Sequence, residues 1–108
     1  MSSYLLLGSR DPFGGQDAEF VFDLAIQLKQ AGNDVTLFLL ENGVLAARAG
    51  AKAPGLDAAI AAGVDVKAED FALRERGIAA DRVRASVTPA PLDTVIDGLA
   101  AGHKTIWS

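Results

Sequence analysis

Short, unbroken runs of apolar residues alternate along the chain with longer segments of helical periodicity. The first run, residues 4–7, stops at Gly8 and is typical of a buried strand in a parallel sheet. The segment after it carries apolar residues at the i, i+3, i+4 and i+7 spacing of a helix face, at Val21, Leu24, Ala25 and Leu28. Gly32 suits the end of that helix, and residues 34–40 (DVTLFLL) predict a second buried strand.

The middle of the chain predicts four further elements, two short helices, a strand and a third helix. Its alanines favour a short helix over residues 44–49, which must end before Pro54, and another over residues 56–62. Residues 64–68 (VDVKA) follow as a third strand. A helix of roughly two turns then extends from residue 69 to a glycine at residue 77.

The last third of the chain predicts a weak strand, a helix and a closing strand. The weak strand is placed at residues 83–85. Thr88 suits the N-cap of the last helix, because Pro89 and Pro91 then fall in its first turn, where proline is tolerated. Residues 104–108 (KTIWS) predict the closing strand.

This alternation of strands and helices is typical of a parallel sheet with helices on both faces. We therefore expect a three-layer α/β/α sandwich with a mostly parallel five-stranded sheet, flavodoxin-like in outline. The 108 residues contain no internal repeat and no linker-like segment, which predicts one domain over residues 1–108.

Composition and charge exclude several classes of function. The formal net charge of -4 argues against nucleic acid as the main partner, which is bound through clustered Lys and Arg. The absence of cysteine excludes disulfides, thiolate metal sites, cysteine nucleophiles and persulfide carriage. With a single histidine, no metal site or bound cofactor is predicted. The N-terminal apolar run is too short for a signal peptide or a membrane span, so we expect a cytoplasmic protein without a membrane partner.

Polar and aromatic side chains follow three of the predicted strands. Because ligands of open α/β sheets gather outside the carboxyl ends of the strands, these side chains are the candidates for a binding pocket. They are Arg10, Phe13, Glu41, Asn42, Glu69 and Asp70. Arg10 either faces a ligand or pairs with Asp11 or Asp17. The glycines around it fit neither a phosphate-binding P-loop nor a dinucleotide fingerprint.

Two interpretations of Glu69 and Asp70 remain open at this point. Acidic residues at the start of a helix stabilise the helix dipole and cap free amides, by roughly 0.3 to 1 kcal/mol. The same pair acts as a general acid and base if burial raises one pKa. His103 is expected at the opposite end of the sheet, and Tyr4 and Trp107 are expected in the core or in subunit contacts.

The pattern as a whole resembles the DsrE/DsrF-like family of small sulfur-relay proteins. The resemblance begins with a loop of Gly, Pro and an aromatic residue, a helix with a Leu-Ala pair, and a G-x-x-V-x-x-F-x-x-x-x-G-V pattern. The matching residues are Pro12, Phe13, Leu24, Ala25, Gly32, Val35, Phe38, Gly43 and Val44. Residues 63–78 are similar to a second family pattern that ends in Arg-Gly-Ile, and residues 104–108 match the closing strand.

The resemblance implies both a lost reactivity and an assembly. Counting back from Arg76-Gly77-Ile78 places Glu69 where sulfur-carrying relatives hold a cysteine. A helix N-terminus that favours a thiolate stabilises a carboxylate equally well, but a carboxylate cannot form a persulfide. The resemblance also implies a trimer or hexamer, or a hetero-oligomer with sulfur-relay subunits.

Two hypotheses of function follow. The first is a non-catalytic binding or assembly subunit related to intracellular sulfur transfer. The second is a small-molecule sensor or enzyme that uses the carboxylates of Glu41, Glu69 and Asp70. The missing cysteine favours the first, in which the chain has no catalytic residue.

Overall fold

A computed structural model describes residues 1–13 and 17–108 of the chain. Within these ranges the strands are β1 (Ser3–Gly8), β2 (Asp34–Leu39), β3 (Asp65–Glu69), β4 (Thr88–Ala90) and β5 (Lys104–Trp107). The α-helices are α1 (Asp17–Gln30), α2 (Pro54–Ala61), α3 (Asp70–Glu75) and α4 (Asp93–Ala100). Two 3-10 helices, η1 (Glu41–Ala47) and η2 (Ala80–Arg82), lie in the connections. Within these ranges, no helix has the length and apolar character that crossing a membrane requires.

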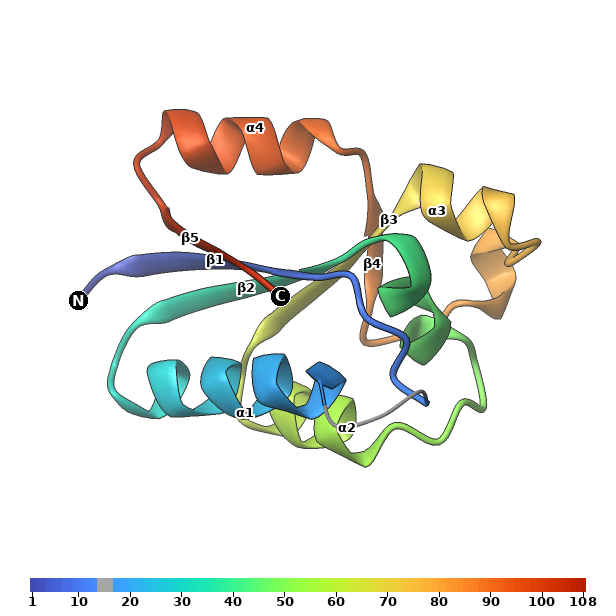
Figure 1. Ribbon diagram of the computed structural model, residues 1–108, viewed down its shortest axis with the longest axis horizontal. Helices are drawn as coiled ribbons and strands as arrows, with labels where there is room; N and C mark the ends of the chain where they lie inside the picture. The colour runs from blue at the N-terminus through green and yellow to red at the C-terminus, as the bar shows by residue number, and fades with distance from the viewer. Residues whose placement is uncertain (14–16) are drawn as a thin grey trace.

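The described strands form one five-stranded sheet in the order β4-β3-β2-β1-β5, and every neighbouring pair is parallel. Helices α1 and α2 cover one face of this sheet and α4 covers the other (Figure 1). The predicted three-layer α/β/α sandwich is therefore confirmed. Strand β1 has β2 on one side and β5 on the other, so the strand order reverses between β1 and β5, where open α/β sheets usually bind ligands.

The two faces of the sheet bury unequal cores. In β1, Leu6 faces the larger cluster beneath α1 and α2, whereas Leu5 and Leu7 face α4, as the two-residue period of a strand requires. The cluster on the α4 side is small. Its buried members are Leu5, Leu7, Phe38, Leu40, Ala90 and Val95. A single described helix, α4, therefore closes this face of the sheet (Figure 1).

The predicted fourth strand at residues 83–85 is wrong. There the chain makes only an isolated bridge, between Val83 and Arg48, and the strand lies at Thr88–Ala90 instead. Pro89 is tolerated because β4 is an edge strand, where a residue without an N–H breaks no pairing with a further strand.

The start of the last helix is also corrected. The helix begins at Asp93, and Thr88 is not its N-cap. Each of the two prolines disfavours helical backbone in the residue before it, so Thr88 and Ala90 are extended. Proline at two alternate positions is therefore better explained by an edge strand than by the first turn of a helix.

The two short helices in the middle of the chain differ from their predictions in detail. The helix expected over residues 44–49 is the 3-10 helix η1, which begins at Glu41 and is followed by extended backbone at Arg48. The next helix begins at Pro54, two residues earlier than expected, because proline suits the first helical turn. At the junction of β3 and α3, by contrast, the prediction of a strand followed directly by a helix is confirmed.

Candidate functional site

A hollow of about 430 Å³ lies where β1 and β5 end, next to the reversal of strand order. We call it the rim pocket. It is lined by Ser9, Arg10, Asp11, Glu41, Asn42, Trp107 and Ser108. Mostly polar side chains therefore surround the position at which this class of sheet binds ligands.

Hydrogen bonds between the ends of β1 and β5 hold one wall of the rim pocket. The Ser108 N–H donates to the Leu7 carbonyl at 2.8 Å, and the Ser9 N–H donates to the Ser108 carbonyl at 3.0 Å. The Ser9 hydroxyl also donates to the Ser108 carbonyl, at 3.0 Å, and accepts a hydrogen bond from the Trp107 indole at 3.3 Å. These bonds orient the indole beside the hollow.

The opposite wall is the first turn of η1, which approaches the end of β1 very closely. A Cβ atom on Gly43 would lie 2.1 Å from the Gly8 carbonyl oxygen, so only glycine fits there. Glu41, at the start of the same turn, has a φ of 50°. It is the one non-glycine residue of the described ranges with a positive φ. Left-handed backbone of this kind costs a residue that has a side chain about 1 kcal/mol. Such residues are frequent at binding sites.

Three of the predicted site residues meet in the rim pocket. These are Arg10, from the loop after β1, and Glu41 and Asn42, from the first turn of η1 after β2. Trp107 joins them, although the sequence suggested a core or subunit position for it; its side chain is 65% exposed. The signal for Trp107 was its place at the carboxyl end of the closing strand.

Phe13 lies outside the rim pocket, on the loop after β1. The Asp11 carboxylate accepts a hydrogen bond from the Phe13 N–H at 2.8 Å, which closes a tight turn. The guanidinium of Arg48 lies 5.7 Å from the centre of the exposed Phe13 ring, a cation–π contact. Gly14 and Gly15 and the side chain of Asp17, a suggested partner of Arg10, lie outside the described parts of the chain.

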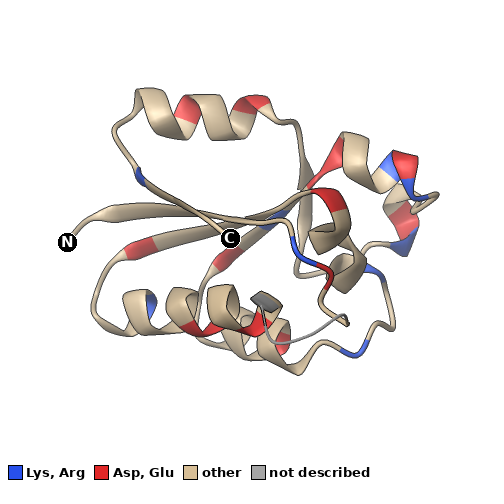
Figure 2. Cartoon of the chain, in the orientation of Figure 1, with Lys and Arg blue, Asp and Glu red and all other residues tan. Residues whose placement is uncertain are grey.

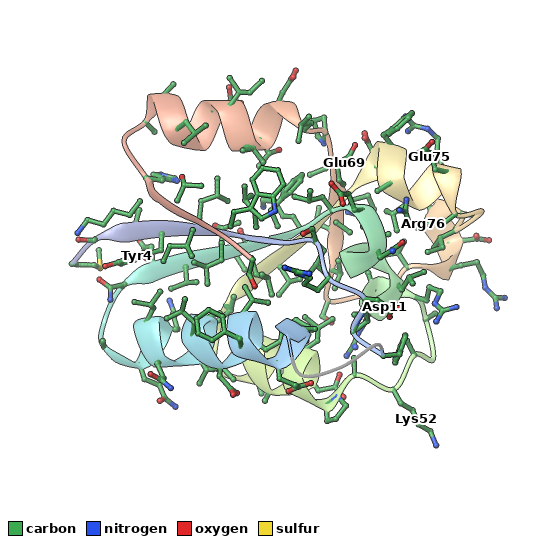
Figure 3. The ribbon with its side chains drawn as sticks, viewed as in Figure 1. Tyr4, Asp11, Lys52, Glu69, Glu75 and Arg76 are labelled. Atoms are coloured by element: carbon green, nitrogen blue, oxygen red, sulfur yellow. The ribbon has the colours of Figure 1, made fainter. Side chains whose placement is uncertain are left out.

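Glu69 and Asp70 are placed apart from Glu41. Glu69 is the N-cap of α3, and its carboxylate accepts a hydrogen bond from the Phe71 N–H at 3.2 Å. Asp70 lines a separate hollow of about 240 Å³ with residues of α3, η2 and β4. Figure 3 shows Glu69 at the start of α3, away from Asp11 on the loop of the rim pocket. Whether any of the six candidates binds a ligand stays a prediction.

Loss of the Glu69 cap is expected to weaken the fold measurably. Glu69→Ala removes the acceptor of the Phe71 N–H, and N-cap removal lowers the free energy of unfolding by about 1 kcal/mol. For a domain of this size, thermal unfolding then shifts down by roughly 4–8 °C, as calorimetry can measure. Glu69→Asp is the control, because it keeps a capping carboxylate. An unchanged melting temperature of Glu69→Ala would show that the cap is not stabilising.

The chemistry available at this edge is that of carboxylates, amides and hydroxyls. In the ranges that the structure describes, no group of three His, Asp or Glu side chains is placed to hold a metal ion. His103 precedes β5, whereas the rim pocket lies at the other end of that strand, so the histidine and the pocket are on opposite edges of the sheet.

Comparison with known proteins agrees with this architecture. The sequence profile of the DsrE/DsrF-like family matches residues 2–107. The chain belongs to the DsrE/DsrF-like family. Among DsrE/DsrF-like folds, the crystal structure of the ychN protein from E. coli matches with a TM-score of 0.89 at 22% sequence identity, and the match covers 100% of both chains.

Two further solved structures share the fold at lower identity. A protein of unknown function, MTH1491 from Methanobacterium thermoautotrophicum, matches with a TM-score of 0.77 at 15% identity over 100% of both chains. BT1422 from Bacteroides thetaiotaomicron matches with a TM-score of 0.76 at 16% identity, over 99% of this chain and 95% of the other. No curated protein sequence matches the chain. At these identities the structures establish the DsrE/DsrF-like fold alone.

Proposed function

We propose that this DsrE/DsrF-like protein is a cytoplasmic, non-catalytic binding and assembly subunit related to sulfur transfer. The family is linked to sulfur relay, and a persulfide requires a cysteine sulfur, of which this chain has none. Glu69 stands where the family resemblance expects the reactive cysteine, and its carboxylate caps α3. A chain of this kind contributes to sulfur transfer by binding other subunits, and not by carrying sulfur.

The observation that carries this proposal is an apolar stripe on the outer side of α4. Leu92, Ile96 and Leu99 are 52%, 59% and 55% exposed, and their i, i+4, i+7 spacing places them on one side of the helix. We call these three residues the α4 stripe. Val95 and Gly98, between them, are buried against the sheet. The helix is therefore apolar on both sides, although the described chain packs against only one.

Burial of the α4 stripe in a subunit interface explains why these residues are apolar. Contiguous apolar surface of this kind marks interaction sites on soluble domains. In Figure 1 α4 forms the outermost layer of its face of the sheet. The partner is either a second copy of the chain, in a trimer or hexamer, or a sulfur-relay subunit of the same fold.

Co-purification tests this proposal. The tagged chain is expressed alone and together with a cysteine-bearing DsrE/DsrF-like protein from the same organism, and native mass spectra are recorded. A homo-oligomer or a mixed complex is the expected result. A chain that is monomeric in both preparations contradicts the proposal.

The rim pocket supports a second candidate function, the binding of a small molecule. Its volume falls in the range of about 300–1,000 Å³ that ligand sites occupy, and Glu41 is held there in unfavourable backbone geometry. Of the carboxylates proposed from the sequence, Glu41 alone lines this pocket; Glu69 and Asp70 lie elsewhere.

Trp107 offers a direct test of this second function. It is the single tryptophan and lines the rim pocket, so a ligand bound there changes its fluorescence. In a metabolite screen we expect hits that both change the fluorescence and raise the melting temperature, and that Glu41→Gln weakens. If no such hits appear, or if Glu41→Gln does not weaken them, the second function is ruled out and the assembly function remains.

A further inference from the structure

A second, more basic hollow lies on the same edge of the molecule as the rim pocket. It has a volume of about 490 Å³ and is formed by the chain after η1, the end of α3, and η2. Its lining residues are Arg48, Ala49, Gly50, Ala51, Arg76, Gly77, Ile78 and Arg82. We call it the arginine cleft, because three arginine residues line it and no acidic residue is among the described residues of its wall.

Backbone pairing between two distant segments fixes the walls of the arginine cleft. The Ala49 N–H donates to the Arg82 carbonyl at 2.6 Å, and the Arg84 N–H donates to the Ala47 carbonyl at 2.9 Å. These bonds accompany the bridge between Arg48 and Val83. Two of the three arginines are therefore held on adjacent backbones, although 34 positions separate them in the sequence.

Arg76 is oriented by neutral groups. Its Nε and Nη2 atoms both donate to the Asn42 side-chain oxygen at 3.1 Å, and its Nη1 donates to the Ala72 carbonyl at 3.2 Å. In Figure 3 its side chain points from the end of α3 toward η1. An amide oxygen and a backbone carbonyl fix the direction of the guanidinium without neutralising it.

The other two cleft arginines also lack a described acidic partner. Arg48 donates from Nε to the Leu45 carbonyl at 3.1 Å, and Arg82 makes no side-chain hydrogen bond or ion pair with the described residues. Two basic residues outside the cleft do have acidic partners. Arg84 forms an ion pair with Asp57, and Lys67 forms one with Asp65 at 3.0 Å.

Positive charge is concentrated around the cleft in a chain that is acidic overall. Six of the ten Lys and Arg residues lie in residues 48–52 and 74–84, together with only two of the fourteen acidic residues. Figure 2 shows basic residues at this end of the molecule, interspersed with acidic ones. The end of α3 offers at most about half a negative charge, which cannot balance three guanidinium groups. An anion bound between them would relieve their mutual repulsion.

We infer that the arginine cleft binds a small molecule through a phosphate or sulfate group. Guanidinium groups bind such tetrahedral oxyanions by paired, charge-assisted hydrogen bonds. The volume of the cleft exceeds what one such group fills and matches that of sites for small organic ligands. The ligand therefore has an organic body beside its anionic group. This inference does not depend on the proposed assembly.

Titration calorimetry of the whole chain in a low-salt buffer tests this inference. The probes are inorganic pyrophosphate and, separately, sulfate, which distinguish the two anion classes. We expect at least one of them to bind at one site per chain. Arg82→Gln removes a guanidinium that has no described bond within the fold, and should weaken binding roughly tenfold or more.

Arg74→Gln is the matched control. Arg74 lies near the end of α3 but lines the hollow of Asp70 instead of the arginine cleft. Arg74→Gln changes the net charge by the same amount as Arg82→Gln. We expect it to weaken binding by less than about threefold, since an exposed charge outside the site acts only through screened attraction. Absence of binding by both probes, or an equal loss of affinity in both variants, would overturn the inference.

Discussion

Replacing Ile96 and Leu99 by aspartate is expected to convert the proposed assembly into folded monomers. Burial of an isoleucine or leucine side chain contributes about 1.5–3 kcal/mol, and an unpaired carboxylate in its place adds a cost of desolvation. Since about 1.4 kcal/mol corresponds to a factor of ten, the double replacement should raise the dissociation constant at least about a thousandfold. Size-exclusion chromatography with light scattering measures the change in mass.

A matched control tests whether the loss of assembly comes from the α4 stripe in particular. Phe20 on α1 is 60% exposed and lies in the helical layer on the other side of the sheet. Phe20→Asp should leave the mass of the assembly unchanged. Circular dichroism should show native helix content in both variants. If the α4 double variant keeps its assembled mass, or if Phe20→Asp alone dissociates the protein, the α4 stripe is not the interface.

The second large effect is expected from Gly43→Ala, which should destabilise the fold strongly. The new methyl group would lie 2.1 Å from the carbonyl oxygen and 3.0 Å from the carbonyl carbon of Gly8, and both are backbone atoms that cannot rotate away. To make room, η1 must move off the end of β1. We expect the free energy of unfolding to fall by about 3 kcal/mol or more, and the melting temperature to fall by more than about 10 °C.

Gly32→Ala separates this clash from the general cost of replacing a glycine. Gly32 has a φ of 94° and no atom within 4 Å of the position of an added Cβ, so its replacement adds backbone strain without a clash. A loss of about 1–2 kcal/mol is expected there. If Gly43→Ala is no more destabilising than Gly32→Ala in calorimetry, η1 is not packed against β1 as described.

The parts of the fold that could be predicted from the sequence are those that local patterns determine. The apolar run at residues 4–7 identified β1, and the helical spacing around Ala25 identified α1. The junction of β3 and α3 was predicted because a carboxylate can cap a helix and Gly77 can adopt the left-handed backbone, with a φ of 68°, that ends it. Each of these signals lies within one turn or one strand.

The parts that could not be predicted depend on contacts between distant segments. Two side-chain nitrogens of Arg76 donate hydrogen bonds to the side chain of Asn42, which lies 34 positions earlier in the sequence. Nothing in either segment indicates that contact. The meeting of Arg48 and Arg82 in one cleft requires the bridge at Val83, where the sequence suggested a strand. The sequence placed the candidates after the predicted strands, but local patterns could not group them into pockets.

The alternating pattern also did not reveal that α4 is apolar on both sides. Leu92, Val95, Ile96 and Leu99 have the spacing of a single apolar helix face, yet only Val95 of these four is buried. The reason is geometric, since a single helix crossing a sheet can press only a narrow stripe against it. The remaining three side chains are the residues on which the proposed assembly depends.

Light scattering of the purified wild-type chain at micromolar concentration tests the central claim most directly. An assembly of identical copies through the α4 stripe predicts the mass of a trimer or hexamer, stable on dilution. The mass of a single chain, with no larger species after co-expression with cysteine-bearing relatives, would contradict it.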